Sequence, residues 1–203
     1  MKVYENRELR ILPFTGENFF KQYDVTTNYY CWFSNQLVTR YNDHGLTPMT
    51  DSDFKSFFAA IENKDVICGA IVDKKKNIHV GNVSLQSFNQ INRSCELAII
   101  IGEPSFWGKG IATRACAVMI YHAFNFLNIH RVWSGTGANN IGMQKVFNKL
   151  GFEQESVFRQ AKFSNGKHVD ILQYSLIRRD YDYLIDTDTL LSKIVNEFII
   201  KGE

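Results

Sequence analysis

Residues 104–113 form the pattern in this chain that is best suited to binding phosphate. They read Pro-Ser-Phe-Trp-Gly-Lys-Gly-Ile-Ala-Thr and join a strand-like apolar segment to a helix-like one. Gly108 and Gly110 allow the backbone to turn its amide groups toward a ligand, and a helix start adds positive potential. Such amides bind a pyrophosphate with few cationic side chains, and Lys109 and Arg114 are placed to assist. A tight strand-to-helix turn would use the same glycines, so a purely structural role stays open.

The spacing of this turn argues against two other glycine-rich phosphate motifs. A Walker A loop needs a longer interval before a Gly-Lys-Ser/Thr ending, which this turn lacks. A dinucleotide fingerprint needs a third glycine where this chain has Thr113. A glycine-rich nucleotide-binding protein is therefore the least favoured class of function.

Alternating and β-branched apolar segments predict the strands that hold the turn in place. The isoleucine-rich run 95–101, just before the turn, predicts a central strand that is buried on both faces. Charged residues 74–77 and the Asn-Gly pair within residues 164–167 each predict a hairpin. The predicted strands are residues 9–14, 66–72, 79–88, 95–101, 131–136, 152–160 and 168–177.

Apolar residues at helical spacing predict the helices that cover these strands. Thr50 with Asp53 is a typical helix start, and Asn140 is a favourable cap for a helix that Gly151 ends. The aromatic stretch 19–33 is predicted to be helical in part. The predicted helical faces are Phe54, Phe57, Phe58 and Ile61, then Ile111, Ala115, Val118 and His122, then Met143, Val146, Phe147 and Leu150. This order of elements indicates a mixed α/β fold with a strand–helix–strand crossover around the turn.

Two blocks of the sequence together resemble the GNAT superfamily of N-acetyltransferases, in its branch similar to ribosomal-protein amino-terminal (RimJ/RimL-like) acetyltransferases. The family's phosphate motif, Arg/Gln-x-x-Gly-x-Gly/Ala, is matched by Ser-Phe-Trp-Gly-Lys-Gly at residues 105–110. The branch's Trp-Gly-Lys-Gly core, followed by Ala and Thr, is matched at residues 107–113. The second block keeps the family's order, with Asn140, Lys149-Leu150-Gly151-Phe152, Asn165-Gly166-Lys167 and Asp170. The resemblance extends roughly over residues 9–181.

The resemblance implies one acetyltransferase domain over residues 1–184, followed by a C-terminal amphipathic helical extension over residues 185–203. The implied fold is a central, mostly antiparallel sheet that is splayed at the cofactor site and flanked by helices. In the extension, apolar residues at helical spacing predict a helix over residues 187–200. Its apolar stripe should cover either its own domain or a second subunit, which leaves a homodimer open.

The activity implied by the resemblance is transfer of an acetyl group from acetyl-CoA to a primary amine, by direct attack in a ternary complex. Backbone groups would align the pantetheine arm and polarise the thioester carbonyl near Ile101, and no metal is required. The implied acetyl-CoA-binding residues are Ile99, Ile100, Ile101, Gly102, Trp107, Gly108, Lys109, Gly110, Ile111, Ala112, Thr113 and Asn140. For Asn140, a role as helix cap explains the residue equally well.

Glu96 is the candidate catalytic base, because it lies on the strand that should carry the cofactor arm. An alkyl amine is mostly protonated at neutral pH, so its attack on a thioester needs a proton acceptor or a lowered amine pKa. Family members often use a Glu at the corresponding place, commonly through water. The alternative is a structural carboxylate that pairs with Arg93 or another base.

The chain departs from the family pattern at three positions. Phe147 replaces the tyrosine that often protonates the leaving thiolate, and Met143 replaces the alternative serine. Water, Tyr174 and Tyr181 remain as candidate proton donors. Ser105 replaces the Arg/Gln of the phosphate motif, which matters less because backbone amides supply much of the recognition.

Composition places the chain among cytoplasmic globular proteins without a nucleic-acid or membrane partner. It has 203 residues, 45% of them hydrophobic, and a formal net charge of +2. Its amino terminus lacks a secretory signal, and its five histidines show no metal-ligand pairing. The cysteines Cys31, Cys68, Cys95 and Cys116 lie far apart, which predicts reduced core residues.

The acceptor amine is the least determined part of the interpretation. The branch resemblance implies a protein amino terminus as the acceptor. The strand at residues 79–84 slightly favours a small amine instead, such as an amino sugar or nucleotide amino sugar. The aromatic cluster of Tyr29, Tyr30, Trp32, Phe33 and Tyr41 fits either an acceptor groove or a core. A non-catalytic acyl-CoA-binding sensor is the alternative from another class, because the usual Tyr and Ser are absent.

Overall fold

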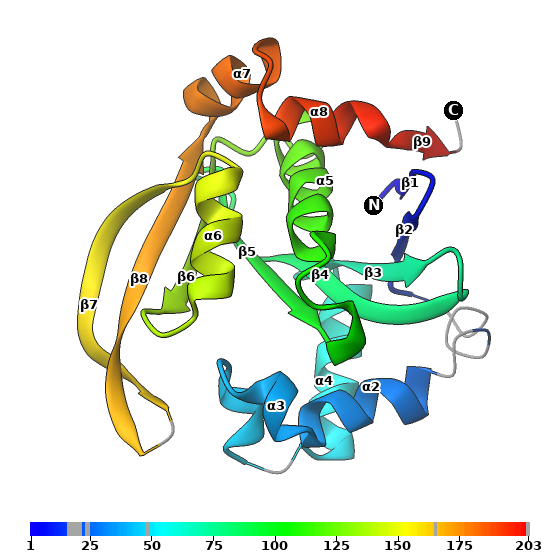
Figure 1. Cartoon of the computed structure of the whole chain (residues 1–203), viewed down its shortest axis with the longest axis vertical. Helices are drawn as coiled ribbons and strands as arrows, with labels where there is room; N and C mark the ends of the chain where they lie inside the picture. Colours follow the sequence, from blue (N-terminus) through cyan, green and yellow to red (C-terminus); the bar gives the residue numbers. More distant parts are fainter. Residues whose placement is uncertain (16–21, 23–24, 48, 165, 202–203) are drawn as a thin grey trace.

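The computed structural model describes residues 1–15, 22, 25–47, 49–164 and 166–201, and places nine strands in one sheet (Figure 1). The strands are β1 (Val3–Glu5), β2 (Leu9–Pro13), β3 (Ile67–Asp73), β4 (Ile78–Asn89), β5 (Ser94–Ile101), β6 (Arg131–Gly137), β7 (Glu153–Ser164), β8 (Lys167–Ile177) and β9 (Ile199–Lys201). Their order across the sheet is β7-β8-β6-β5-β4-β3-β2-β1-β9. The curved β7–β8 hairpin forms one end of the sheet, and both termini lie near the other (Figure 1).

The sheet is antiparallel except between β5 and β6, which run parallel and pair along only part of their length. The pairing joins Ser94 to Arg131, Cys95 to Val132 and Glu96 to Trp133. Beyond Glu96 the two strands diverge, although both continue. The prediction of a mostly antiparallel, splayed sheet is confirmed.

Helices cover both faces of the sheet. They are α2 (Val25–Ser34), α3 (Gln36–Thr39), α4 (Asp51–Glu62), α5 (Ile111–Asn125), α6 (Ile141–Lys149), α7 (Arg178–Asp186) and α8 (Leu190–Glu197). Successive strand residues point to opposite faces, so Ile71 packs in the core under α5, whereas Ala70 and Val72 pack in the aromatic core of α2 and α4. The crossover helix α5 is buried along most of its length because apolar residues occupy nearly its whole surface.

Local signals explain where several helices begin. Thr50 and Asp53 form a reciprocal capping box at α4, as predicted. The Asn140 side chain accepts a hydrogen bond from the Met143 amide at α6, which confirms its role as a cap. Gly151, with φ of +80°, follows the end of α6 in the left-handed region that favours glycine.

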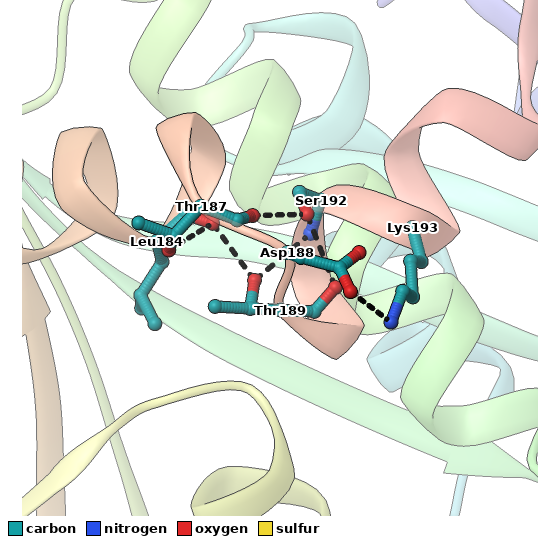
Figure 2. Close-up of polar contacts among 6 residues, drawn as sticks. All are labelled: Leu184, Thr187, Asp188, Thr189, Ser192 and Lys193. Atoms are coloured by element: carbon teal, nitrogen blue, oxygen red, sulfur yellow. Dashed lines mark hydrogen bonds and ion pairs between the residues drawn. The ribbon is translucent and has the colours of Figure 1, made fainter.

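The prediction of one C-terminal helix over residues 187–200 is wrong in its bounds. Three polar residues, 187–189, separate α7 from α8: the Thr189 hydroxyl accepts from the Ser192 amide, and the Ser192 hydroxyl donates to the Thr187 carbonyl at 2.6 Å (Figure 2). At the other end, the chain becomes extended at Phe198 and pairs as β9 with β1. The apolar side of α8 packs against α5 of the same chain through Leu191 and its neighbours.

Two other predictions need correction, and some short or polar elements were not predicted. Cys31 is exposed, whereas the other three cysteines are buried, so the expectation of four core cysteines is wrong. Strand β5 is not buried on both faces, because only Cys95 and Leu97 are inaccessible and its remaining residues are half-buried beside the splay. Strand β1 and helices α3 and α7 were not predicted, since the first two are only three and four residues long and the third is rich in charged residues.

Part of the aromatic stretch and one predicted turn residue lie outside the described residues. The helical part of residues 19–33 is α2, while residues 16–21, 23, 24 and the turn residue Asn165 lie outside the described residues. Within the described part of the chain, no helix is long and apolar enough to cross a bilayer.

Candidate active site

A cavity of about 680 Å³ lies between the diverging parts of β5 and β6 and reaches the first turn of α5. It exists because the strands stop pairing after Glu96 and Trp133 while α5 and α6 cover the gap. The predicted base Glu96 lines it. The predicted acetyl-CoA-binding residues that line it are Ile99, Ile100, Ile101, Trp107, Gly108, Gly110, Ile111, Ala112, Thr113 and Asn140.

The glycine turn at the mouth of this cavity needs both of its glycines. Gly108 and Gly110 have φ of +72° and +74°, a region that other residues rarely adopt. A side chain at Gly108 would enter open space, because no atom lies within 4 Å of its Cβ position. The turn is anchored by Trp107, whose Nε1 donates to the Ile101 carbonyl at 2.8 Å. The geometry therefore leaves the front of the turn open to a ligand.

Two predicted cofactor residues do not line the cavity. A Cβ atom at Gly102 would lie 1.8 Å from the Trp32 ring, so glycine is required there for packing. Trp32 also donates from Nε1 to the Glu103 carboxylate at 3.2 Å. The ammonium group of Lys109 lies 5.2 Å from the centre of the Phe106 ring. The backbone carbonyl of Lys109 accepts a hydrogen bond from the Arg114 guanidinium.

Ser134 stabilises the point at which the strands separate. Its hydroxyl donates to the Leu97 carbonyl at 2.7 Å and is buried, although it belongs to β6 and Leu97 to β5. The side chain thus supplies a hydrogen bond where strand pairing has ended. Sequence reasoning did not identify Ser134, because a single serine in a strand carries no signal until the register of β5 and β6 is known.

Glu96 is held by neighbours on β4 rather than by a basic residue. Its Oε2 accepts from Gln86 Nε2 at 3.1 Å and from Ser87 Oγ at 3.0 Å. Arg93, the partner considered from sequence, instead directs its guanidinium toward Asn128 Oδ1 at 3.4 Å. Burial, followed by the charge of Glu96, raises the pKa of the neighbouring Cys95 thiol to about 12.

Helix α3 and the residues that follow it line one side of the cavity, and the β7–β8 hairpin contacts these residues. Arg40 lies over the rings of Tyr41 and Trp107, at 4.7 and 5.0 Å from their centres. Lys162 near the hairpin tip pairs with Asp43, and the Ser164 hydroxyl donates to the Arg40 carbonyl at 3.4 Å. These contacts between distant parts of the chain had no signal in the sequence.

The charge of the cavity lining is predominantly positive. Its ionised side chains in the described part of the chain are Arg40, Glu96, Lys145 and Lys149. Lys149 belongs to the second sequence block, but neither lysine was predicted as a site residue. One carboxylate and three cations suit an anionic ligand better than a polycation.

The aromatic cluster near the amino terminus is mainly core. Tyr29, Trp32 and Phe33 are buried between α2, α4 and the sheet, whereas Tyr41 lines the cavity. Beneath them, His79 is buried with its Nε2 2.7 Å from Asn82 Oδ1 and 3.0 Å from the Gly81 carbonyl oxygen. Burial lowers the pKa of His79 to about 4.

The candidate proton donors named from sequence lie outside the cavity lining. Tyr174 packs on the buried ring of Phe147, with 4.8 Å between ring centres, and its hydroxyl donates to Gln154. Tyr181 packs on Phe124, and its hydroxyl contacts Asn125. Tyr41 and Ser134 are hydroxyl-bearing residues that do line the cavity. No cluster of three or more metal-ligating side chains occurs among the described residues.

Comparison with known protein families matches residues 19–153 to the acetyltransferase (GNAT) domain. The chain is 35% identical over 102 residues to the putative ribosomal N-acetyltransferase YdaF of Bacillus subtilis (strain 168), which covers 50% of this chain and 55% of that protein. It is 30% identical over 101 residues to spermidine N(1)-acetyltransferase of Escherichia coli (strain K12), which covers 50% and 54%. The chain thus spans about half the length of these two relatives.

Solved structures share the fold over nearly the whole chain. The spermidine N-acetyltransferase of Vibrio cholerae, in complex with CoA and spermine, superposes with a TM-score of 0.73 at 20% identity, covering 87% of this chain and 99% of that one. RimL, a ribosomal L7/L12 alpha-N-protein acetyltransferase in complex with coenzyme A, superposes with a TM-score of 0.71 at 16% identity, covering 84% and 94%. The predicted fold class is therefore confirmed.

Proposed function

Because this chain belongs to the GNAT acetyltransferase family, we propose that it transfers the acetyl group of acetyl-CoA to a primary amine. The observation that carries the proposal is the cavity between β5 and β6, which has the open glycine turn at its mouth and Glu96 on its wall. The two solved structures named above, those of the Vibrio cholerae spermidine N-acetyltransferase and RimL, contain CoA, which supports acetyl-CoA as the acyl donor.

The residues present fit acetyl-CoA as the donor substrate. The turn at Gly108 and Gly110 offers open space before the start of α5, where backbone amides and the helix dipole favour phosphate. Lys145 and Lys149 line the same cavity from α6 and add positive charge. The diverging β5 segment, with Ile99 to Ile101, leaves a slot for an extended arm that ends near Glu96.

The proposed reaction is direct attack of the amine nitrogen on the thioester carbonyl carbon. A C–N bond forms, the C–S bond breaks, and the leaving sulfur takes the bonding electron pair. Glu96 accepts the proton that the neutral amine loses on attack, directly or through one water molecule. A water molecule protonates the thiolate, and the hydroxide that remains takes the proton from Glu96, which restores the carboxylate. Ser134 joins the two strands at the closed end of the slot through its hydrogen bond to Leu97. Orientation in this slot is the main contribution of the chain to rate.

The charges of the cavity favour an acceptor with a single amine, such as a protein amino terminus. A polyamine carries several positive charges and needs several carboxylates, whereas the described cavity lining offers only Glu96 beside three cations. An α-amino group also has a pKa of about 8, compared with about 10.4 for an alkyl amine, so more of it is neutral at pH 7.

An acceptor panel with detection of the released thiol tests this proposal. The panel contains a lysine-free peptide with a free amino terminus, the same peptide with a blocked terminus, spermidine and glucosamine. We expect acetyl-CoA-dependent turnover of the free peptide and none of the blocked one. Faster turnover of spermidine or glucosamine would overturn the acceptor class, and no thiol release with any amine would overturn the proposed activity.

A further inference from the structure

Two side chains of β4 fix the orientation of the Glu96 carboxylate. Gln86 Nε2 and Ser87 Oγ both donate to Oε2, at 3.1 and 3.0 Å. The described residues place no hydrogen bond on Oε1. Because one oxygen receives both donors, the other is left to accept a proton from a group in the cavity that Glu96 lines.

Ser87 reaches this carboxylate only because β4 contains a bulge. Gln86 pairs with Glu96 and Asn89 pairs with Ser94, so two residues of β4 lie opposite the single residue Cys95 of β5. In a regular strand, Ser87 would point to the face opposite Gln86. In the bulge its φ is +52°, and its hydroxyl turns to the same carboxylate oxygen that Gln86 contacts.

The positive φ of Ser87 carries a steric cost that glycine would not have at this position. Serine rarely adopts positive φ, and glycine is the residue favoured there. Non-glycine residues in this region often mark functional sites, where the side chain matters more than backbone strain. Here the side chain is exposed and its hydroxyl donates to Glu96, so packing does not explain why serine is present.

We propose that Ser87, supported by Gln86, is a positioning residue that orients Glu96 to accept the proton of the acceptor amine. The inference rests on the proposed function, since it gives Ser87 a part in the same acetyl transfer. Ser87 acts through Glu96 and does not touch the reacting atoms. Its loss should therefore lower kcat and leave the KM for acetyl-CoA unchanged.

The experiment is a double-mutant cycle between Ser87→Ala and Glu96→Gln, measured as thiol release from acetyl-CoA with the lysine-free peptide and with spermidine. Ser87→Gly is the second variant, because it removes both the hydroxyl and the backbone cost and should fold at least as well. Ser87→Asn is the rescue variant, since asparagine tolerates positive φ and carries an N–H donor. Asn77→Gly, at φ of +53° in the β3–β4 turn, is the control for glycine substitution alone.

We expect Ser87→Ala and Ser87→Gly to lower kcat about tenfold, the equivalent of one hydrogen bond to a charged group. Ser87→Asn should recover most of this loss, and Asn77→Gly should have the wild-type kcat. In the Glu96→Gln background, Ser87→Ala should cause no further loss, because the carboxylate that it positions is absent.

Equal losses from Ser87→Ala in both backgrounds, or a wild-type kcat in Ser87→Gly, would overturn the positioning role. Other outcomes would reject the proposed function itself. If Glu96→Gln alone leaves kcat unchanged, then Glu96 is not the base and both proposals about this carboxylate fall. If no amine of the full acceptor panel supports thiol release, then the proposed acetyl transfer is wrong and the positioning role falls with it.

Discussion

Glu96 lies where β5 and β6 begin to diverge, and its carboxylate is bound by two neutral donors instead of a cation. Glu96→Gln keeps the size of the side chain but removes the proton acceptor. We expect kcat to fall by about 10²-fold or more, the usual contribution of a positioned base, while CoA binding is retained. The loss should become smaller at high pH, where more of the amine is already neutral. A folded variant with an unchanged rate across pH would show that Glu96 is structural.

His79 links the stability of the chain to pH. Burial lowers its pKa to about 4, below the value of 6.5 expected for the unfolded chain. Between these values the unfolded chain binds a proton that the folded chain does not. The stability that His79 contributes should therefore be fully present above pH 6.5, and its loss should lower the free energy of unfolding by up to about 1.4 kcal/mol per pH unit as pH drops toward 4.

Denaturant unfolding of wild type and His79→Gln at several pH values measures this dependence. Buried His122 has its pKa lowered to about 4 in the same way, so the variant should lose part of the slope and keep the rest. The exposed His168→Gln should retain the wild-type slope. A wild-type slope in His79→Gln would contradict the assignment to His79.

The sequence indicated the glycine turn and the start of α5, and the structure explains why both glycines occur there. Gly108→Val should lower the thermal shift caused by CoA, because its side chain enters the open space before the turn. At CoA concentrations about 100-fold above Kd, the wild type should gain about 2.7 kcal/mol of stability.

Gly166→Val is the matched control for the glycine turn. Gly166 has φ of +77° and equally open space at its Cβ position, but it lies in the β7–β8 hairpin. Both variants should lose similar intrinsic stability, while only Gly108→Val should lose the response to CoA. An undiminished thermal shift in folded Gly108→Val would place CoA elsewhere.

Helix α8 is held by its apolar side, as the spacing of its residues predicted, although its bounds differ. Leu191 is 1% exposed against the α5 core, whereas Leu190 is 42% exposed. Leu191→Ala should lower the free energy of unfolding by about 2–5 kcal/mol, and Leu190→Ala by less than about 1 kcal/mol. Urea unfolding measures both values. Similar small losses in the two variants would contradict packing of α8 on α5.

For the whole molecule, sequence patterns predicted most strands and helices because hydrophobic periodicity, caps and glycine turns are local signals. They also predicted most residues of the cavity wall, because these lie within one continuous segment around the turn. Arg40, Ser134 and the pair of Lys162 with Asp43 were not predicted, since they meet only when distant elements pack. The bulge at Ser87 was not predicted either, because it depends on the register of β4 and β5.

We propose that this chain is an acetyltransferase that holds acetyl-CoA between β5 and β6 and passes its acetyl group to an amine. The most direct measurement uses ¹³C-acetyl-CoA with the lysine-free, free-terminus peptide and follows labelled amide by mass spectrometry alongside released thiol. We predict equal amounts of amide and thiol, both dependent on enzyme and amine. Binding of CoA with no labelled amide from any amine of the panel would contradict acetyl transfer and indicate a non-catalytic acyl-CoA-binding protein.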